Sequence, residues 1–243
     1  MTMDMIDIKK YHWLSPVFVI QSAVKMYQLY SEEVVTTKNE FKKVQEAVAA
    51  AFALLGMYQD QRVHYFMQCS RDRSPDILTL TLAEIPVAPY VEGRYQTVEV
   101  VTYEAHSDES IFEFLVKTKL SPKKAYDDKT IILCHVSKAM QIPDERDLHN
   151  MLKTVSPKPQ IVILGKLKNA ETKYTLMQVW PFAARIEYDA ATLAKSYPQP
   201  PHMKLLRTMD KKVKFTHTNE VKAPTIYEVF GIDEEKVKKY LLK

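Results

Sequence analysis

Two short, uninterrupted apolar runs constrain the fold of this chain more than any other feature. Residues 130–136 read TIILCHV, and residues 160–164 read QIVIL. Continuous apolar runs of this length are typical of strands that are covered on both faces. A helix is expected between them, over residues 145–155. The pair therefore predicts alternating strands and helices in a sheet that is covered on both sides.

The residues before these runs predict a helix, three strands and a second helix. The helix over 39–57 carries one apolar stripe, and Gly56 is placed to end it. The three strands are expected over 62–69, 76–83 and 95–103, and the second helix over 108–119. A further strand is expected after the apolar runs, over 174–179. A meander followed by alternating strands and helices predicts an α/β fold with a mixed central sheet flanked by helices.

Three segments are expected along the chain. Residues 1–37 form an N-terminal peripheral element, helical around 16–30, and residues 38–196 form the core. Residues 197–243 are interpreted as a linker and a basic C-terminal tail that ends in a short helix over 233–242.

The net charge of +4 comes from the C-terminal residues. Residues 201–243 hold ten Lys or Arg against six Asp or Glu, whereas the first 200 residues hold 24 of each. This mild basic excess is compatible with a nucleic-acid partner but does not demonstrate one. With only 4 glycines, the chain is a poor candidate for a site built from glycine-rich loops.

Other features indicate a cytoplasmic protein with no membrane partner. Cys69 and Cys134 lie inside apolar, strand-like runs, which favours reduced core thiols over a disulfide. Charged residues such as Asp4 and Lys9 precede any apolar stretch, so we expect no signal peptide. Apolar stretches such as 14–24 are too short and interrupted to span a bilayer.

A pair of carboxylates on neighbouring predicted strands is the best candidate for chemistry. The sequence has no P-loop, G-x-S-x-G or H-E-x-x-H motif, and its histidines are scattered. Asp76 begins one predicted strand, and Glu99 lies within the next. If these strands pair, both carboxylates reach one end of the sheet, where two oxygen donors suit Mg²⁺.

Pro75-Asp76 and Glu99-Val100-Val101 resemble the motif of the PD-(D/E)XK, or restriction-endonuclease-like, superfamily. That motif is Pro-Asp followed, after a gap, by Asp/Glu-x-Lys on an apolar strand. The resemblance covers roughly residues 38–181. It implies a restriction-endonuclease-like core in which Asp76 and Glu99 bind Mg²⁺, with Mn²⁺ as a substitute, to hydrolyse a phosphodiester of DNA.

The helix around Gln45 is similar to the first helix of Mrr-type and Holliday-resolvase-type members of this superfamily. That helix often carries a metal-binding Glu at the position of Gln45. The resemblance therefore implies an assisting role for Gln45, although an amide weakens metal affinity relative to a carboxylate.

The second half of the motif departs from the family pattern. Val101 stands where the lysine should be, on the same face of the strand as Glu99, and it cannot orient or activate water. Either the lysine has moved to the next helix, where Lys117 and Lys119 are the nearest candidates and Lys117 is preferred, or the core is catalytically inactive. Under the second reading, the protein is a binding or assembly module with DNA, a protein partner or a second copy.

Structural interpretations of the same residues stay open. Asp76 is equally compatible with a turn, Glu99 with a salt bridge, Gln45 with a hydrogen-bonded core amide, and Lys117 with a solvated helix face. Further lysines are expected to contact phosphate, or alternatively to be solvated or packed on a partner: Lys119, Lys123, Lys124, Lys211 and Lys212.

Overall fold

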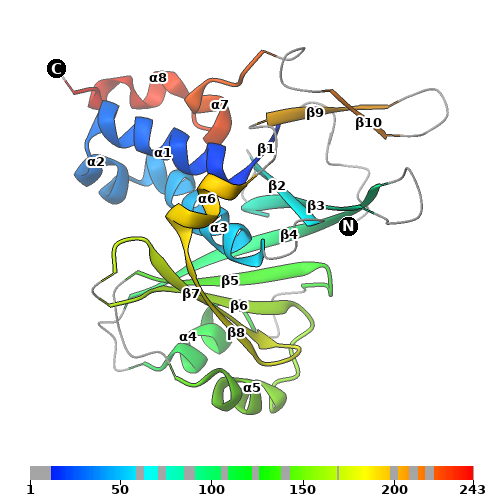
Figure 1. The fold of residues 1–243 in the computed structure, drawn as a ribbon. Coiled ribbons are helices and arrows are strands. Elements are labelled where there is room, and N and C mark those ends of the chain that lie inside the picture. Colours follow the sequence, from blue (N-terminus) through cyan, green and yellow to red (C-terminus); the bar gives the residue numbers. More distant parts are fainter. Residues whose placement is uncertain are drawn as a thin grey trace.

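The chain folds into a mixed β-sheet with helices on both faces in the computed structural model (Figure 1). The predicted fold class, α/β with a mixed central sheet flanked by helices, is confirmed. The structure describes residues 12–58, 63–70, 75–84, 91–104, 109–121, 126–137, 143–168, 170–197, 202–207, 213–216 and 222–242.

Ten strands are found within these ranges. They are β1 (Trp13–Leu14), β2 (Val63–Cys69), β3 (Ile77–Glu84), β4 (Val91–Tyr103), β5 (Thr130–Val136), β6 (Gln160–Lys166), β7 (Lys173–Trp180), β8 (Ala184–Asp189), β9 (His202–Arg207) and β10 (Val213–Thr216).

The helices precede the sheet, cross over it and close the chain. They are α1 (Pro16–Tyr30), α2 (Glu32–Thr37), α3 (Lys42–Met57), α4 (Ile111–Thr118), α5 (Glu145–Lys153), α6 (Ala190–Ser196), α7 (Ile226–Phe230) and α8 (Glu234–Val237), with short 3₁₀ turns at Asn39–Phe41 and Lys238–Tyr240.

The strands are hydrogen-bonded in the order β10-β9-β1-β2-β3-β4-β5-β6-β7-β8. β2, β3 and β4 form an antiparallel meander. β4, β5 and β6 are parallel, and α4 and α5 supply the two crossovers between them. Parallel neighbours need such crossovers, because a tight turn can join only antiparallel strands. β7 and β8 extend the sheet with antiparallel pairs.

The two faces of the sheet carry separate hydrophobic cores. One core joins α1, α3, α7 and α8 to residues such as Val98, Val100 and Leu133. The other joins α4 and α5 to residues such as Ile132 and Cys134. Successive residues of β4 and β5 thus enter opposite cores, as expected for strands that are buried on both sides.

The helix over 39–57 is present, but Gly56 does not end it. α3 continues through Met57, and Tyr58 is its C-terminal cap. A methyl group at position 56 would run into the aromatic ring of Tyr188 on β8. The glycine therefore permits close packing between α3 and the edge of the sheet instead of a change in chain direction.

The N-terminal and C-terminal segments both pack on α3. α1 buries Val19 and Met26 in the α3 core, and α7 and α8 bury Phe230 and Val237 in the same core. The Tyr30 and Tyr227 hydroxyl groups are hydrogen-bonded at 2.8 Å, although 197 positions separate them. The segment boundaries expected at 37/38 and 196/197 stay predictions.

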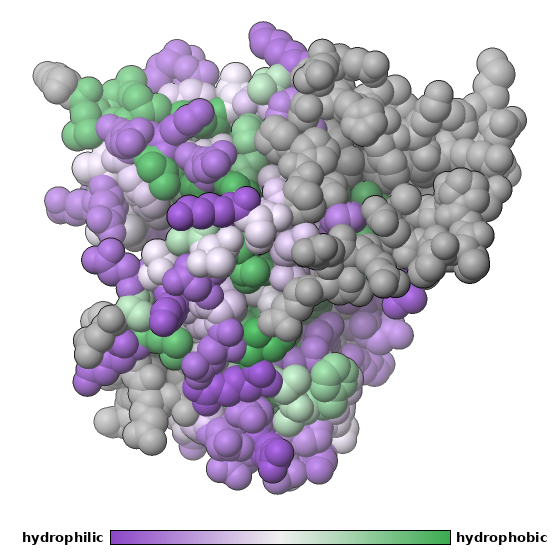
Figure 2. All heavy atoms as spheres, in the orientation of Figure 1, coloured by the Kyte–Doolittle hydropathy of each residue, from purple (hydrophilic) through white to green (hydrophobic). Residues whose placement is uncertain are grey.

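Hydrophobic side chains also gather on the surface near the end of this helical layer (Figure 2). Leu29, Leu241 and Leu242 are exposed there, and the Leu242 backbone N–H donates to the Leu29 carbonyl at 2.9 Å.

Seven elements were not expected from the sequence: β1, α2, β8, α6, β9, β10 and α7. β8 lies at the sheet edge, and half-buried and exposed residues alternate along most of it. Such a strand has little apolar signal. The segment from Tyr197 was interpreted as a linker, yet the Tyr197 hydroxyl donates to the Tyr65 carbonyl at 2.6 Å and β9 pairs with β1.

Candidate functional site

Asp76 and Glu99 are brought together by the antiparallel pairing of β3 and β4. The register places Ile77 opposite Val98, and its continuation by one residue places Asp76 opposite Glu99. Directly opposed residues of an antiparallel pair project to the same side of a sheet. The backbone also holds Asp76 in place, because its Oδ2 accepts a hydrogen bond from the Val100 N–H at 2.8 Å.

Glu99 is buried and forms an ion pair with Lys119. The Lys119 Nζ lies 3.0 Å from the Glu99 Oε2, and the two side chains are only 13% and 9% exposed. Lys119 follows the last residue of α4 and caps that helix in a non-helical conformation, with φ −123° and ψ −32°. The Lys119 amine therefore extends from the end of α4 to Glu99 in the middle of β4.

Asp76 interacts electrostatically with the other charged residues of the site. Burial raises the pKa of Asp76, the Val100 N–H opposes that rise, and the charge of Glu99 adds to it. Lys119 and Lys42 also lower the pKa of Asp76, but the net shift is upward. The nearby lysines do not fully compensate the negative charge of the two carboxylates, so this region favours a cation.

Glu46 contributes a third carboxylate from α3. It is 8% exposed, and its carboxylate is 3.1 Å from the Nζ of the solvated Lys42. Burial and then the charge of Asp76 raise the pKa of Glu46. α3 packs against the opposite face of the sheet from α4, so Glu46 and Lys119 approach Asp76 from different sides.

Gln45, the predicted assisting residue, is directed away from this site. Its amide nitrogen donates to the carbonyls of Val35 at 3.0 Å and Thr36 at 2.9 Å, so it ties α3 to α2. Its neighbour Glu46 is instead the residue of α3 whose carboxylate interacts electrostatically with Asp76. The sequence holds a signal for this, since Glu46 precedes the sheet-facing Ala50 and Ala53 by four and seven positions.

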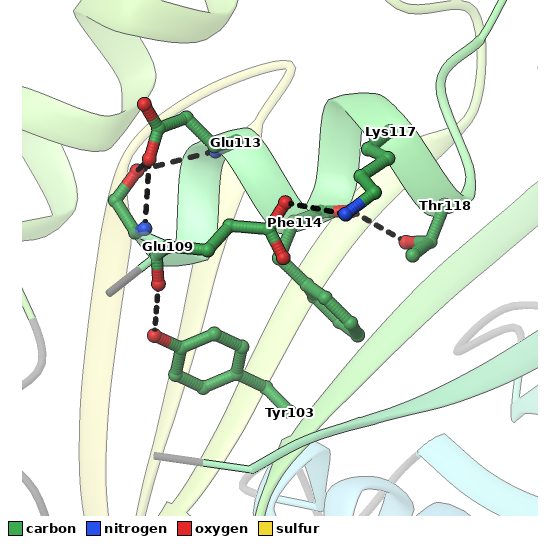
Figure 3. A network of polar contacts seen from close by, with 7 residues as sticks. Tyr103, Glu109, Glu113, Phe114, Lys117 and Thr118 are labelled. Carbon is green, nitrogen blue, oxygen red and sulfur yellow. Dashed lines mark hydrogen bonds and ion pairs between the residues drawn. The ribbon is translucent and has the colours of Figure 1, made fainter. Parts of the chain in front are cut away.

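Lys117, the lysine preferred from the sequence, also points elsewhere. Figure 3 shows its amine beside Glu109 at the start of α4, at 3.3 Å from the Glu109 Oε1. The Tyr103 hydroxyl fixes this segment by donating to the Glu109 carbonyl at 2.5 Å. Lys117 is 75% exposed. It lies two residues before Lys119, and of these two lysines Lys119 reaches the carboxylates.

Tyr126 borders the carboxylate pair just before β5. Burial raises the pKa of its phenol to about 12, and the charges of Glu99 and Asp76 add to that rise. Sequence reasoning did not identify Tyr126, because it lies in a polar turn.

The expected phosphate-contacting lysines divide into two groups. Lys119 is engaged in the buried ion pair. Lys123, Lys124, Lys211 and Lys212 lie outside the described residues.

The donor set at Asp76 and Glu99 fits a small, oxygen-preferring cation. Mg²⁺ uses one or two protein carboxylates and fills its remaining positions with water and phosphate oxygens. Within the described part of the chain, no group of three or more His, Cys, Asp or Glu is arranged to share one ion. The fit therefore depends on the two opposed carboxylates, with Glu46 as an additional nearby charge.

The chain matches no model of a known protein family, and no curated protein matches it. Among the described residues, no helix is both long and apolar enough to cross a membrane.

Proposed function

We propose that this protein acts on nucleic acid as a Mg²⁺-dependent phosphodiesterase with a restriction-endonuclease-like core. The observation that carries the proposal is the meeting of Asp76, at the start of β3, with Glu99 within β4 and a buried lysine. The order α3, β2, β3, β4, α4, β5 agrees with the order on which the sequence resemblance rests.

Each residue has a distinct role in this proposal. Asp76 and Glu99 would hold the ion, and the hydrogen bond from Val100 orients one of these carboxylates. When bound, Mg²⁺ polarises the phosphodiester and lowers the pKa of water. Lys119 supplies the amine that is missing at Val101, and it donates to the attacking water or to a phosphate oxygen.

DNA cleavage in the presence of Mg²⁺ or Mn²⁺ tests this proposal. We expect the wild type to nick plasmid DNA, and we expect Asp76→Asn and Glu99→Gln to reduce the rate at least about 10²-fold. Glu109→Gln is the matched control, because it removes a carboxylate from the exposed ion pair of α4. Full activity in both site variants, or none in the wild type with either metal, would reject the proposal.

A second function, binding or assembly without catalysis, is favoured by a different observation. Glu99 already has a buried cationic partner, and an internal ion pair of this kind needs no metal. In that case, Mn²⁺ binding should not depend on Asp76 or Glu99. The protein should shift DNA in a gel, or associate with itself in sedimentation, without cutting the DNA.

A further inference from the structure

Lys119 contacts Glu99 on β4 from the end of α4. Its backbone N–H closes the end of α4 by donating to the Leu115 carbonyl at 2.9 Å, and Leu115 is buried in the α4–α5 core. The side chain then crosses to β4, where Val101 fills the position in which the superfamily motif places its lysine. The amine is therefore anchored on a different element from the carboxylate that it contacts.

The Lys119 amine lies in a region of negative charge around Asp76. Glu46, Asp76 and Glu99 place three carboxylates in a largely buried region. Lys42, the partner of Glu46, is 72% exposed, so solvent screens most of its charge. Lys119 is 13% exposed and lies directly on Glu99. Its charge consequently acts on the carboxylate pair with little screening.

A cation that enters this site meets a positive charge already in contact with one of its ligands. Like charges a few ångströms apart repel more strongly inside a protein than in water. Binding of a divalent ion and retention of the Lys119–Glu99 contact are thus opposed to each other.

We propose that Lys119 is the internal counter-ion of the metal-free site and that a divalent cation displaces its amine from Glu99. This inference rests on the proposed function. Lys119 would occupy two positions in succession. At rest, the amine neutralises Glu99. After the ion binds, the amine is released to donate to the phosphate group or to water.

The decisive measurement is Mn²⁺ affinity by calorimetry at about pH 8, where accessible carboxylates are ionised. We expect Lys119→Gln to bind Mn²⁺ about tenfold more tightly than the wild type, because an opposing charge has been removed. Lys117→Gln, the matched control on α4, should bind like the wild type, and Glu99→Gln should lose binding. A lysine with a purely structural role would give the opposite sign, a weaker site in Lys119→Gln.

The outcomes separate this inference from the proposed function. Equal or weaker Mn²⁺ binding in Lys119→Gln, with binding still lost in Glu99→Gln, overturns the inference alone. Absence of Mn²⁺ binding in both the wild type and Lys119→Gln overturns both.

Amine labelling of the wild type provides a second measurement that needs no variant. Reductive methylation followed by mass spectrometry reports how accessible each lysine is. We expect Mn²⁺ to increase the labelling of Lys119 and to leave that of Lys117 unchanged. Unchanged or reduced labelling of Lys119 at saturating Mn²⁺ would overturn the inference, even if Lys119→Gln fails to fold.

Discussion

α4 is linked to two ion pairs of the same chemical type in different surroundings. Within its last turn, Lys117 lies 3.3 Å from Glu109, a residue just before the helix, with side chains 75% and 25% exposed. At its end, Lys119 and Glu99 lie 3.0 Å apart with side chains 13% and 9% exposed. The distances are similar, so the difference in solvent access separates a surface contact from a candidate site.

This difference has an energetic meaning. An exposed pair gains little, because water and salt screen both charges. A buried pair has lost most of its hydration, so either partner is costly when the other is removed. The buried pair can be retained for a function that outweighs its modest net stability.

The largest expected effect is the loss of Lys119. Lys119→Met should lower the free energy of unfolding by about 3 kcal/mol, because Glu99 is left buried without this cation. Lys117→Met should change it by less than about 0.5 kcal/mol. Urea unfolding followed by circular dichroism measures both, and similar losses in the two variants would contradict the contrast.

A double-mutant cycle sharpens the same comparison. Glu99→Gln combined with Lys119→Met should lose less than the sum of the single losses, with a coupling energy of about 2 kcal/mol. The cycle of Glu109→Gln and Lys117→Met serves as its control and should give less than about 0.5 kcal/mol. Additive losses at the buried pair would show that the two side chains stabilise the fold independently.

The pH dependence of stability should have opposite signs at Glu46 on α3 and at Glu113 on α4. The pKa of Glu46 is raised above its ordinary value of 4.5, so its folded state holds the proton more tightly. The associated stability is present below pH 4.5 and is lost as the pH rises through the raised folded pKa. Glu46→Gln should remove this loss and stabilise the protein at neutral pH.

Glu113 near the start of α4 is the control of opposite sign. Hydrogen bonds from the backbone N–H and the hydroxyl of Ser110 lower the pKa of Glu113. Its contribution is present above pH 4.5 and is lost as the pH falls through the lowered folded pKa. Thermal unfolding as a function of pH for Glu46→Gln and Glu113→Gln tests both signs, and equal slopes would contradict the assignment.

The smallest expected effect concerns salt. The change in unfolding free energy caused by Glu109→Gln should be below about 0.5 kcal/mol at about 0.05 M NaCl and should vanish at about 0.5 M NaCl. The change caused by Glu99→Gln should persist, since the buried pair is poorly screened. Parallel unfolding curves at both salt concentrations provide the measurement.

The sequence was informative wherever one residue pattern dominated. The apolar run TIILCHV predicted β5 with the bounds that the structure shows, and the strand order brought Asp76 opposite Glu99. Both predictions depend on local composition and on simple strand pairing. The polar edge strand β8 lacked that signal.

Two features of the site required the three-dimensional structure. The family resemblance drew attention to Gln45 on α3, whereas the sheet-facing side of that helix is lined by small residues such as Ala50 and Ala53, in line with Glu46. On α4, helical spacing favoured Lys117, but the helix ends at Thr118, so Lys119 leaves the helical path. Neither helix orientation nor the position of a helix end follows reliably from apolar spacing.

The hydrogen bond between Tyr30 and Tyr227 has a consequence for folding during synthesis. The helical layer of α1 and α3 is completed by Phe230 and Val237, which are translated long after α1. A growing chain therefore carries α1 with part of its apolar side uncovered until α7 and α8 leave the ribosome. Contacts between such distant residues slow folding and prolong exposure to aggregation.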